Sequence, residues 1–209
     1  MTALRPIVHV VDDDASFLGA TSRLLSASGF AVKAYPSADD FLAKCEAGEP
    51  GCVVADLQMP GLNGLELQAA LARSGNPMPV VFLTGNADTE STVRAMRAGA
   101  EDFLEKRAPL EALLDAVKRA LERGAQQHAT RARQLELAGR FETLSLRERE
   151  VLVHVLRGRL NKQIASDLDI NERTVKRHRT SIMAKLEVRA VVDLVRLADE
   201  AGGERNPAG

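Results

Sequence analysis

The chain has 209 residues, of which 45% are hydrophobic and 27% charged, and a formal net charge of −1, which is typical of an ordinary soluble globular protein of one or two domains. The N-terminus lacks a basic-then-apolar signal pattern, and no apolar run reaches the roughly 20 residues needed to cross a bilayer, so we expect a cytoplasmic protein without a membrane partner. The two cysteines, Cys45 and Cys52, form neither a disulfide framework nor a metal-site spacing, which agrees with a reducing compartment.

Strand and helix signals alternate through roughly the first 120 residues. Short apolar runs predict five strands, at Ile7–Val11, Phe30–Tyr35, Cys52–Ala55, Val80–Leu83 and Asp102–Leu104. Leu and Ala at three- and four-residue spacing predict helices at roughly 15–28, 38–46, 63–73, 88–98 and 109–122. The alternation predicts a doubly wound α/β domain over residues 1–122, with a five-stranded parallel sheet of the flavodoxin-like kind and helices on both faces.

The third predicted strand ends in an acid, Asp56, and a Pro-Gly turn follows at residues 60 and 61. Asp56 is therefore expected at the C-terminal edge of the sheet, where open α/β sheets bind their ligands. Taken alone, an acid at such a position is most often a capping or turn residue, since loops between strands and helices frequently carry Asp. The residues at the ends of the other strands change this interpretation.

Four further polar residues follow strands and would lie at the same edge as Asp56, namely Asp12, Asp13, Thr84 and Lys106. In a sheet of order 2-1-3-4-5 the first and third strands are neighbours, so three carboxylates would meet there. Clustered carboxylates repel one another unless a cation neutralises them, and Mg²⁺ prefers oxygen ligands. Such a site suits a phosphoryl group, because the metal and Lys106 would neutralise its oxygens, Thr84 would donate a hydrogen bond and one carboxylate would be the nucleophile.

Residues 123–142 are polar and rich in Ala, Gln and Arg, and we interpret them as a linker with helical character. Gly124 is a candidate stop signal for the preceding helix.

The remaining residues, 143–201, contain helix signals only and predict a small all-α domain. A capping box at Ser145 predicts a helix from Leu146 to about Arg157. Asn161 and Asn171 are candidate caps for helices at 162–168 and 172–186, and a fourth pattern covers Ala190–Ala201. The second and third helices, joined by three residues, form a helix-turn-helix pattern, and we expect the tail, 202–209, to be disordered.

The charge is distributed unevenly between the two parts. Residues 1–120 hold 11 Lys and Arg against 16 Asp and Glu, whereas residues 157–189 hold 9 against 4. On a helical wheel, one face of the helix at 172–186 carries Arg173, Lys176, Arg177, Thr180 and Ala184. A basic face backed by an apolar one is what a helix in the DNA major groove needs, although a solvated cationic helix has the same pattern.

The first part resembles the receiver domains of two-component response regulators. The residues that carry the resemblance are Val-Val-Asp-Asp-Asp at 10–14, Asp-Leu-Gln-Met-Pro-Gly at 56–61, Gly64, Thr84-Gly85, Ala98-Gly99-Ala100 and Glu105-Lys106. The resemblance implies that Asp56 accepts a phosphoryl group from a sensor histidine kinase. It also implies a Mg²⁺ site formed by Asp12, Asp13, Asp56 and the backbone carbonyl of Gln58. Thr84 and Phe103 would be the switch pair, although a strand-end residue and a static core residue are the alternative interpretations.

One departure from the family pattern concerns the residue after Lys106. These domains usually have proline there, often across a cis bond, whereas this chain has Arg107-Ala108-Pro109. A cis bond before a non-proline residue costs about 2.5–4 kcal/mol, which favours a trans bond that would shift Lys106, although both isomers stay open. We predict an altered but functional pocket.

Residues 143–201 resemble the LuxR-type DNA-binding domain, so that the whole chain is similar to response regulators of the NarL/FixJ class. The matching residues are Leu146–Leu152, Asn161–Ala165, Thr174–Arg179 and Ile182–Leu186. By position in the family motif, Lys176, Arg177 and Thr180 would face bases, and the phosphate candidates are Lys162, Thr174, Arg179 and Lys185. The fourth helix would supply a dimer surface, although core packing is a competing use of its apolar residues, Val191, Leu194, Val195 and Ala198.

The sequence therefore predicts a DNA-binding response regulator and not an enzyme. A sensor histidine kinase would phosphorylate Asp56, and the protein would then bind double-stranded DNA as a homodimer, with RNA polymerase as a candidate partner. Two alternatives stay open. A phosphoaspartyl phosphatase would use the same acidic edge, but its Asp-x-Asp-x-Thr motif is absent. A phosphate sink or interaction module with a degenerate DNA-binding domain is disfavoured by the intact basic face.

Overall fold

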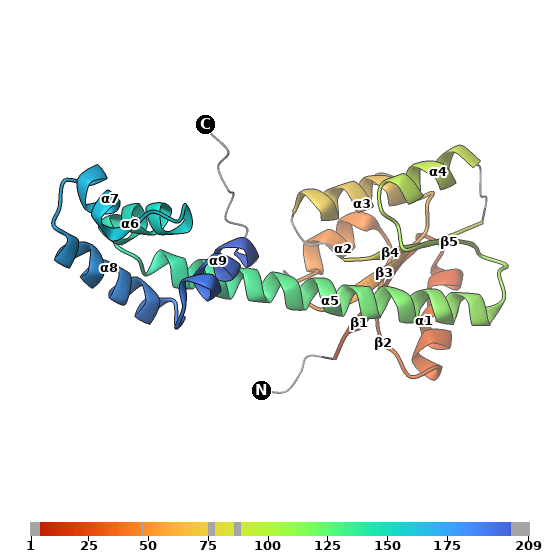
Figure 1. Ribbon diagram of the computed structural model, residues 1–209. Helices are drawn as coiled ribbons and strands as arrows, with labels where there is room; N and C mark the ends of the chain where they lie inside the picture. Colours follow the sequence, from red (N-terminus) through yellow and green to blue (C-terminus); the bar gives the residue numbers. More distant parts are fainter. Residues whose placement is uncertain (1–4, 47, 75–77, 86–88, 202–209) are drawn as a thin grey trace. The chain divides into compact units, whose positions relative to one another are not determined.

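The computed structural model describes residues 5–46, 48–74, 78–85 and 89–201, and the predicted tail, 202–209, lies outside this range. The chain divides into two compact units, residues 1–129 and 130–209, which are described separately (Figure 1). No helix among the described residues is long and apolar enough to cross a membrane.

The first unit is built on a five-stranded parallel sheet with the strand order β2-β1-β3-β4-β5. The strands are β1 (Ile7–Val11), β2 (Ala31–Tyr35), β3 (Gly51–Ala55), β4 (Val80–Thr84) and β5 (Asp102–Glu105). The helices are α1 (Ala15–Ala27), α2 (Ala38–Lys44), α3 (Gly64–Arg73), α4 (Thr89–Arg97) and α5 (Leu110–Glu142). The predicted doubly wound α/β fold is confirmed, and the first and third strands are neighbours as the prediction required.

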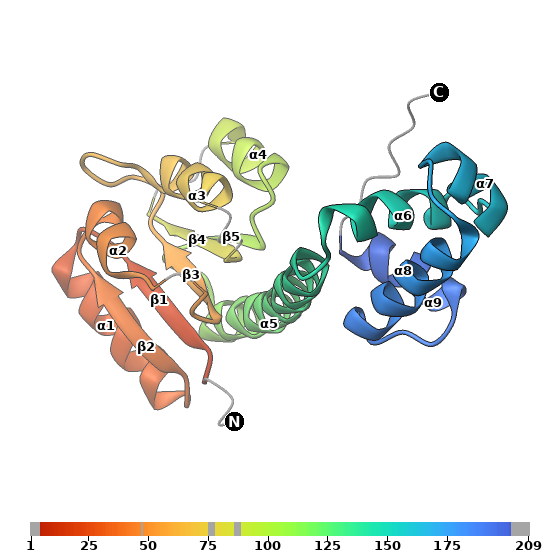
Figure 2. The same cartoon turned by 90° about the vertical axis from the view of Figure 1, so that its left-hand side faces the viewer.

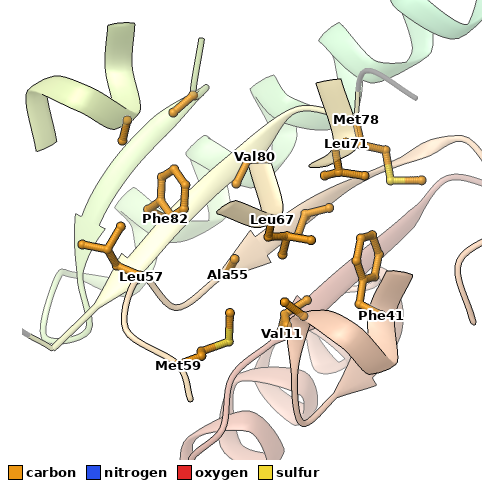
Figure 3. Packing of buried hydrophobic residues seen from close by; sticks show 14 of the residues in the cluster. Val11, Phe41, Ala55, Leu57, Met59, Leu67, Leu71, Met78, Val80 and Phe82 are labelled. Carbon is orange, nitrogen blue, oxygen red and sulfur yellow. The ribbon is translucent and has the colours of Figure 1, made fainter. Parts of the chain in front are cut away.

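Two apolar layers cover the sheet, because its central strands are hydrophobic on both faces. On one face Val11, Val53 and Phe82 pack with buried residues of α2, α3 and α4. Figure 3 shows Val11 and Phe82 together with Phe41 of α2 and Leu67 of α3. On the other face Val10 and Val54 pack with buried residues of α1 and α5. Figure 2 shows the strands of the sheet with the helices around them. The strand ends are thereby held at fixed positions along one edge.

Helix α5 does not stop at Gly124, in contrast to the stop signal that the sequence suggested, and it continues to Glu142. A Cβ atom at position 124 would lie 2.5 Å from the carbonyl oxygen of Gly51. The glycine is therefore needed where the helix passes close to the start of β3, and it does not break the helix.

The second unit contains the end of α5 and the helices α6 (Leu146–Leu156), α7 (Asn161–Asp167), α8 (Glu172–Lys185) and α9 (Val191–Glu200), packed on one apolar core. The capping box at Ser145 and the cap at Asn171 are confirmed. The predicted cap at Asn161 is wrong, because α7 begins at Asn161 itself and the Gln163 side chain accepts a hydrogen bond from the N–H of Leu160. The Asn161 side chain accepts instead from Arg179, at 3.0 Å.

Candidate functional site

Two carboxylates lie side by side at the C-terminal edge of the sheet. Asp12 directly follows β1 and Asp56 directly follows β3, and the N–H of Asp56 donates to the carbonyl of Val11 at 2.9 Å. The two side chains are 2% and 8% exposed. Asp13 is exposed, and one carboxylate oxygen from each of the three acids lies within 4.8 Å of the others. The structure thus brings together the three acids that the sequence analysis placed here.

Lys106, which follows β5, lies between Asp12 and Asp56 and binds both. Its Nζ lies 2.7 Å from Oδ2 of Asp12 and 2.7 Å from Oδ2 of Asp56. The ammonium also lies 4.3 Å from the centre of the Phe17 ring, in α1, at a distance suited to a cation–π contact. Burial disfavours the charged ammonium, but its hydrogen bonds with the two carboxylates outweigh this effect and raise the pKa of Lys106.

Lys106 contacts both Asp12 and Asp56 although no proline follows it. No cis peptide bond occurs among the described residues, so the Lys106–Arg107 bond, whose isomer the sequence left open, is trans. The N–H of Lys106 donates to the carbonyl of Thr84 at 2.8 Å, which fixes the backbone beside the end of β4. Arg107 points away, since its side chain is 87% exposed and pairs with Glu105.

The loop after Asp56 is held close to the site by Gly64, the first residue of α3. A Cβ atom at this position would lie 2.4 Å from the carbonyl oxygen of Asp56 and 2.9 Å from the Phe82 ring. In this loop the N–H of Gln58 donates to Oδ1 of Asp56 at 3.2 Å. Likewise, Oδ1 of Asp12 accepts from the N–H of Asp14 at 3.0 Å. Asp12 and Asp56 therefore each direct Oδ2 at Lys106 and have Oδ1 in a backbone hydrogen bond.

The acidic edge has the donors that a hard cation needs. Burial raises the pKa of the Asp12 carboxyl, and the hydrogen bond from Lys106 offsets this only in part. A divalent cation among the three carboxylates would favour their charged forms. Oxygen donors with one exposed member, Asp13, suit Mg²⁺, which binds a few carboxylates and keeps several waters.

The two residues of the predicted switch pair lie on adjacent strands. Thr84, the last residue of β4, is 1% exposed, and Phe103, on β5, is partly buried. The Phe103 ring packs on Phe82, with ring centres 6.0 Å apart and planes inclined by 46°. The partial burial of Phe103 is compatible with both interpretations of this residue, the switch and the static core side chain.

The second unit presents the predicted basic face on α8. Arg173, Lys176 and Arg177 are exposed, and none of them has an ion pair or side-chain hydrogen bond within the part of the chain that the structure describes. Val175, Ile182 and Leu186, on the opposite side, are buried in the core. The face is therefore free to contact another molecule along its length.

Glu148 of α6 holds α8 in place, a role that its capping box alone did not indicate. Its carboxylate is buried and accepts from Ser181 at 2.6 Å and from Lys185 at 2.7 Å, besides the N–H of Ser145. Burial opposes the charged form, but these hydrogen bonds outweigh it and lower the pKa of Glu148 to about 2. Two predicted phosphate contacts thus have partners within the protein: Lys185 binds Glu148, and Arg179 binds Asn161.

The other predicted contacts of this unit differ in their exposure. Lys162 and Thr180 are exposed, and Thr174 is partly buried with its hydroxyl 2.9 Å from Oδ1 of Asn171. On α9, Leu194 is buried in the core of the same unit, which is the competing use that the sequence left open, and Ala198 is also buried. Val191 and Val195 are partly exposed.

Comparison with protein families divides the chain in the same way. Residues 8–118 match the model described as "Response regulator receiver domain", and residues 142–198 match "Bacterial regulatory proteins, luxR family".

Individual relatives match almost the whole chain. The response regulator protein TodT of Pseudomonas putida F1 is 41% identical over 193 residues, which are 92% of this chain and 85% of TodT. The transcriptional regulatory protein FixJ of Rhizobium meliloti is 40% identical over 196 residues, covering 94% of this chain and 96% of FixJ. Among solved structures, the response regulator StyR is 43% identical with a TM-score of 0.81, over 94% of this chain and 99% of StyR.

Proposed function

The chain belongs to the response regulators in which a receiver domain precedes a LuxR-type DNA-binding domain, and we propose that a phosphoryl group on Asp56 controls how tightly it binds DNA. The family is one of transcriptional regulators, and its two domains imply a histidine kinase and DNA as partners. We assign the receiver to residues 1–122, the linker to 123–142 and the DNA-binding domain to 143–201. Bacterial DNA lies in the cytoplasm, which is the compartment we propose.

The observation that carries this proposal is the position of Lys106 between Asp12 and Asp56. An oxygen of Asp56 would form a bond to the phosphorus of a kinase phosphohistidine while the phosphorus–nitrogen bond breaks and the histidine keeps the electron pair. Lys106 would then neutralise an oxygen of the new phosphoryl group, and Thr84 would donate to another. Slow attack of water on the phosphorus would break its bond to Asp56, release inorganic phosphate and return the free carboxylate.

Mg²⁺ bound by Asp12, Asp13, Asp56 and the carbonyl of Gln58 would supply positive charge to the transferring oxygens. The donor set supports this assignment, because three carboxylate oxygens lie within 4.8 Å of one another. Asp12 and Asp13 would hold the cation, while the hydrogen bond from the N–H of Gln58 would keep Asp56 oriented for attack.

Phosphorylation would reach the DNA-binding domain through a change of state. The Thr84 hydroxyl would move to the phosphoryl group and the Phe103 ring would follow inward, since Phe103 is only partly buried. The active form would bind the major groove as a homodimer, with Lys176, Arg177 and Thr180 facing bases and the partly exposed side of α9 at the dimer contact. RNA polymerase is the further partner that we propose for the DNA-bound form.

The test is labelling of the full chain with a small phosphodonor, followed by DNA binding and sedimentation. Wild type should be labelled in the presence of Mg²⁺ but not when the metal is chelated before the phosphodonor is added, and Asp56→Asn should not be labelled. Phosphorylated protein should sediment as a dimer and bind selected genomic fragments more tightly than unphosphorylated protein. Equal weak labelling of wild type and Asp56→Asn would reject Asp56 as the acceptor.

A further inference from the structure

A second group of side chains of the types that bind metals lies at the receiver sheet and plays no part in the proposed phosphorylation. It consists of His9 on β1, Cys45 directly after α2, and Glu49 shortly before β3. One ligand atom from each of these residues lies within 4.8 Å of the other two. The group joins a strand, the end of a helix and a loop, and it is formed only by the fold.

The His9 ring is fixed by aromatic neighbours. It is 0% exposed, stacks on Tyr35 with ring centres 5.7 Å apart and meets Phe41 edge-on at 5.3 Å. Its Nδ1 lies 3.2 Å from the Tyr35 hydroxyl. A metal-binding histidine is usually held in this way, with one ring nitrogen bound to a second group while the other binds the metal.

The other ring nitrogen faces Glu49 without a hydrogen bond. Nε2 of His9 lies 3.7 Å from Oε2 of Glu49, which is too long for a hydrogen bond. Neither atom has a hydrogen-bond partner among the described residues, although both are buried. Burial, offset only in part by Glu49, lowers the pKa of His9 to about 4, so at neutral pH the ring is uncharged and the approach is not an ion pair.

We propose that His9, Cys45 and Glu49 bind a thiophilic divalent cation of the Zn²⁺ type, with water in the fourth position. Zn²⁺ takes imidazole nitrogen, thiolate sulfur and carboxylate oxygen in a tetrahedron, in which bonds of about 2.0–2.2 Å place a nitrogen and an oxygen about 3.4 Å apart. The 3.7 Å between His9 and Glu49 is close to this spacing. Sulfur and nitrogen donors also disfavour Mg²⁺.

Charge and local contacts agree with this assignment. One thiolate and one carboxylate cancel the two charges of the cation. Lys33 lies 2.7 Å from Oε1 of Glu49, which leaves Oε2 directed at His9. Burial raises the pKa of the Cys45 thiol, so the thiolate would form when the cation binds, with release of one proton to solvent. Cys45 is partly exposed, which gives a cation access to the group.

The proposal is tested with Co²⁺ titrated into the full chain without a histidine tag, because a cobalt–thiolate bond gives a charge-transfer absorption band that nitrogen and oxygen ligands do not give. Wild type should show the band, Zn²⁺ should remove it by competition, and Cys45→Ala should abolish it. Cys52→Ala is the matched control, since Cys52 is buried in the apolar layer on the other face of the sheet. Asp56→Asn, which alters the acidic edge, should also leave the band intact.

Two further measurements test the proposal without the Cys45→Ala variant. Glu49→Gln should weaken Zn²⁺ binding by at least about tenfold, which is the smallest effect expected even of a residue that only supports a ligand. In wild type, Zn²⁺ should slow alkylation of Cys45 by iodoacetamide. Absence of a cobalt–thiolate band in wild type, a band that survives in Cys45→Ala, or alkylation at the same rate with and without Zn²⁺ would each overturn the proposal.

Discussion

Lys106 lies 2.7 Å from Asp56 although the residue after the lysine is Arg107 instead of the proline usual in the family. The position is fixed by the backbone hydrogen bond from Lys106 to Thr84 and by the Phe17 ring next to the ammonium. Because these contacts come from β4 and α1, the residue that follows Lys106 has little influence on them. The lysine therefore reaches both acids without a proline after it.

Replacing Lys106 by methionine should destabilise the protein when Mg²⁺ is absent. The buried carboxylates of Asp12 and Asp56 would lose a shared partner, which we expect to cost about 1–3 kcal/mol in the free energy of unfolding. Mg²⁺ should recover part of this loss by taking over the neutralisation. Urea unfolding with and without Mg²⁺ measures both effects. Lys44→Met is the control, since Lys44 is largely exposed and its pair with the partly exposed Asp40 should contribute less than about 1 kcal/mol.

Gly64→Ala should lower the free energy of unfolding by about 1–3 kcal/mol, because its Cβ would meet the carbonyl of Asp56 at 2.4 Å and the backbone would have to shift. The same shift moves Asp56 relative to Lys106, so phosphorylation should slow as well. Gly139→Ala, in helix α5, should instead be neutral or slightly stabilising, because nothing beyond the adjoining backbone of the helix lies within 4 Å of the added group. Equal stability of the two variants would show that the loop after Asp56 adapts to the added group.

Glu148→Gln should cost about 1.5–3 kcal/mol of stability at neutral pH, since the carboxylate accepts charge-assisted hydrogen bonds from Lys185. The folded-state pKa of about 2 lies below the ordinary value of 4.5, so this stabilisation is fully present above about pH 4.5 and is lost as the pH falls towards 2. The difference in unfolding free energy between wild type and Glu148→Gln should therefore narrow over that range. If the difference in unfolding free energy did not change with pH, the loss of stability in Glu148→Gln would come from altered packing and not from the charge of Glu148.

Arg177→Ala should weaken binding to the preferred operator by about 1–3 kcal/mol and relax the preference at one base pair. Arg177 is exposed on α8 and has no partner among the described residues, so the substitution should change the stability of the protein little. Lys162→Ala provides the comparison, because loss of a phosphate contact should weaken binding to all DNA sequences alike. It should also reduce the slope of log binding constant against log salt concentration by about one. Binding measured over a set of operator variants and salt concentrations separates the two. Equal loss on every sequence for Arg177→Ala would assign it to phosphate.

The acidic edge was predictable from the sequence because its members all occupy strand ends. A parallel sheet gathers the residues after β1, β3, β4 and β5 at one edge, so Asp12, Asp56 and Lys106 were expected to meet before any distance was known. The helices and strands were predictable from the spacing of apolar residues, since the helix and strand periods mark which side of each element is buried.

Contacts between side chains far apart in the sequence and away from the strand ends were not predictable. Glu148 formed its expected capping box, but its bonds to Ser181 and Lys185, 33 and 37 residues away, depend on how α6 meets α8. The Asn161 side chain was expected to cap α7 but binds Arg179 instead. Cys45 has no metal-site spacing to another cysteine or histidine, and its neighbour His9 is reached only through the pairing of β1 with β2 and β3.

The bonds of Glu148 also determine how the second unit can meet DNA. With Ser181 and Lys185 tied to α6 and Val175, Ile182 and Leu186 in the core, α8 is preorganised before any encounter. Docking into the groove then costs little ordering of the protein, and the interface is expected to form with small backbone movement. Differences between strong and weak operators should consequently arise from base contacts and from the energy needed to deform each DNA sequence.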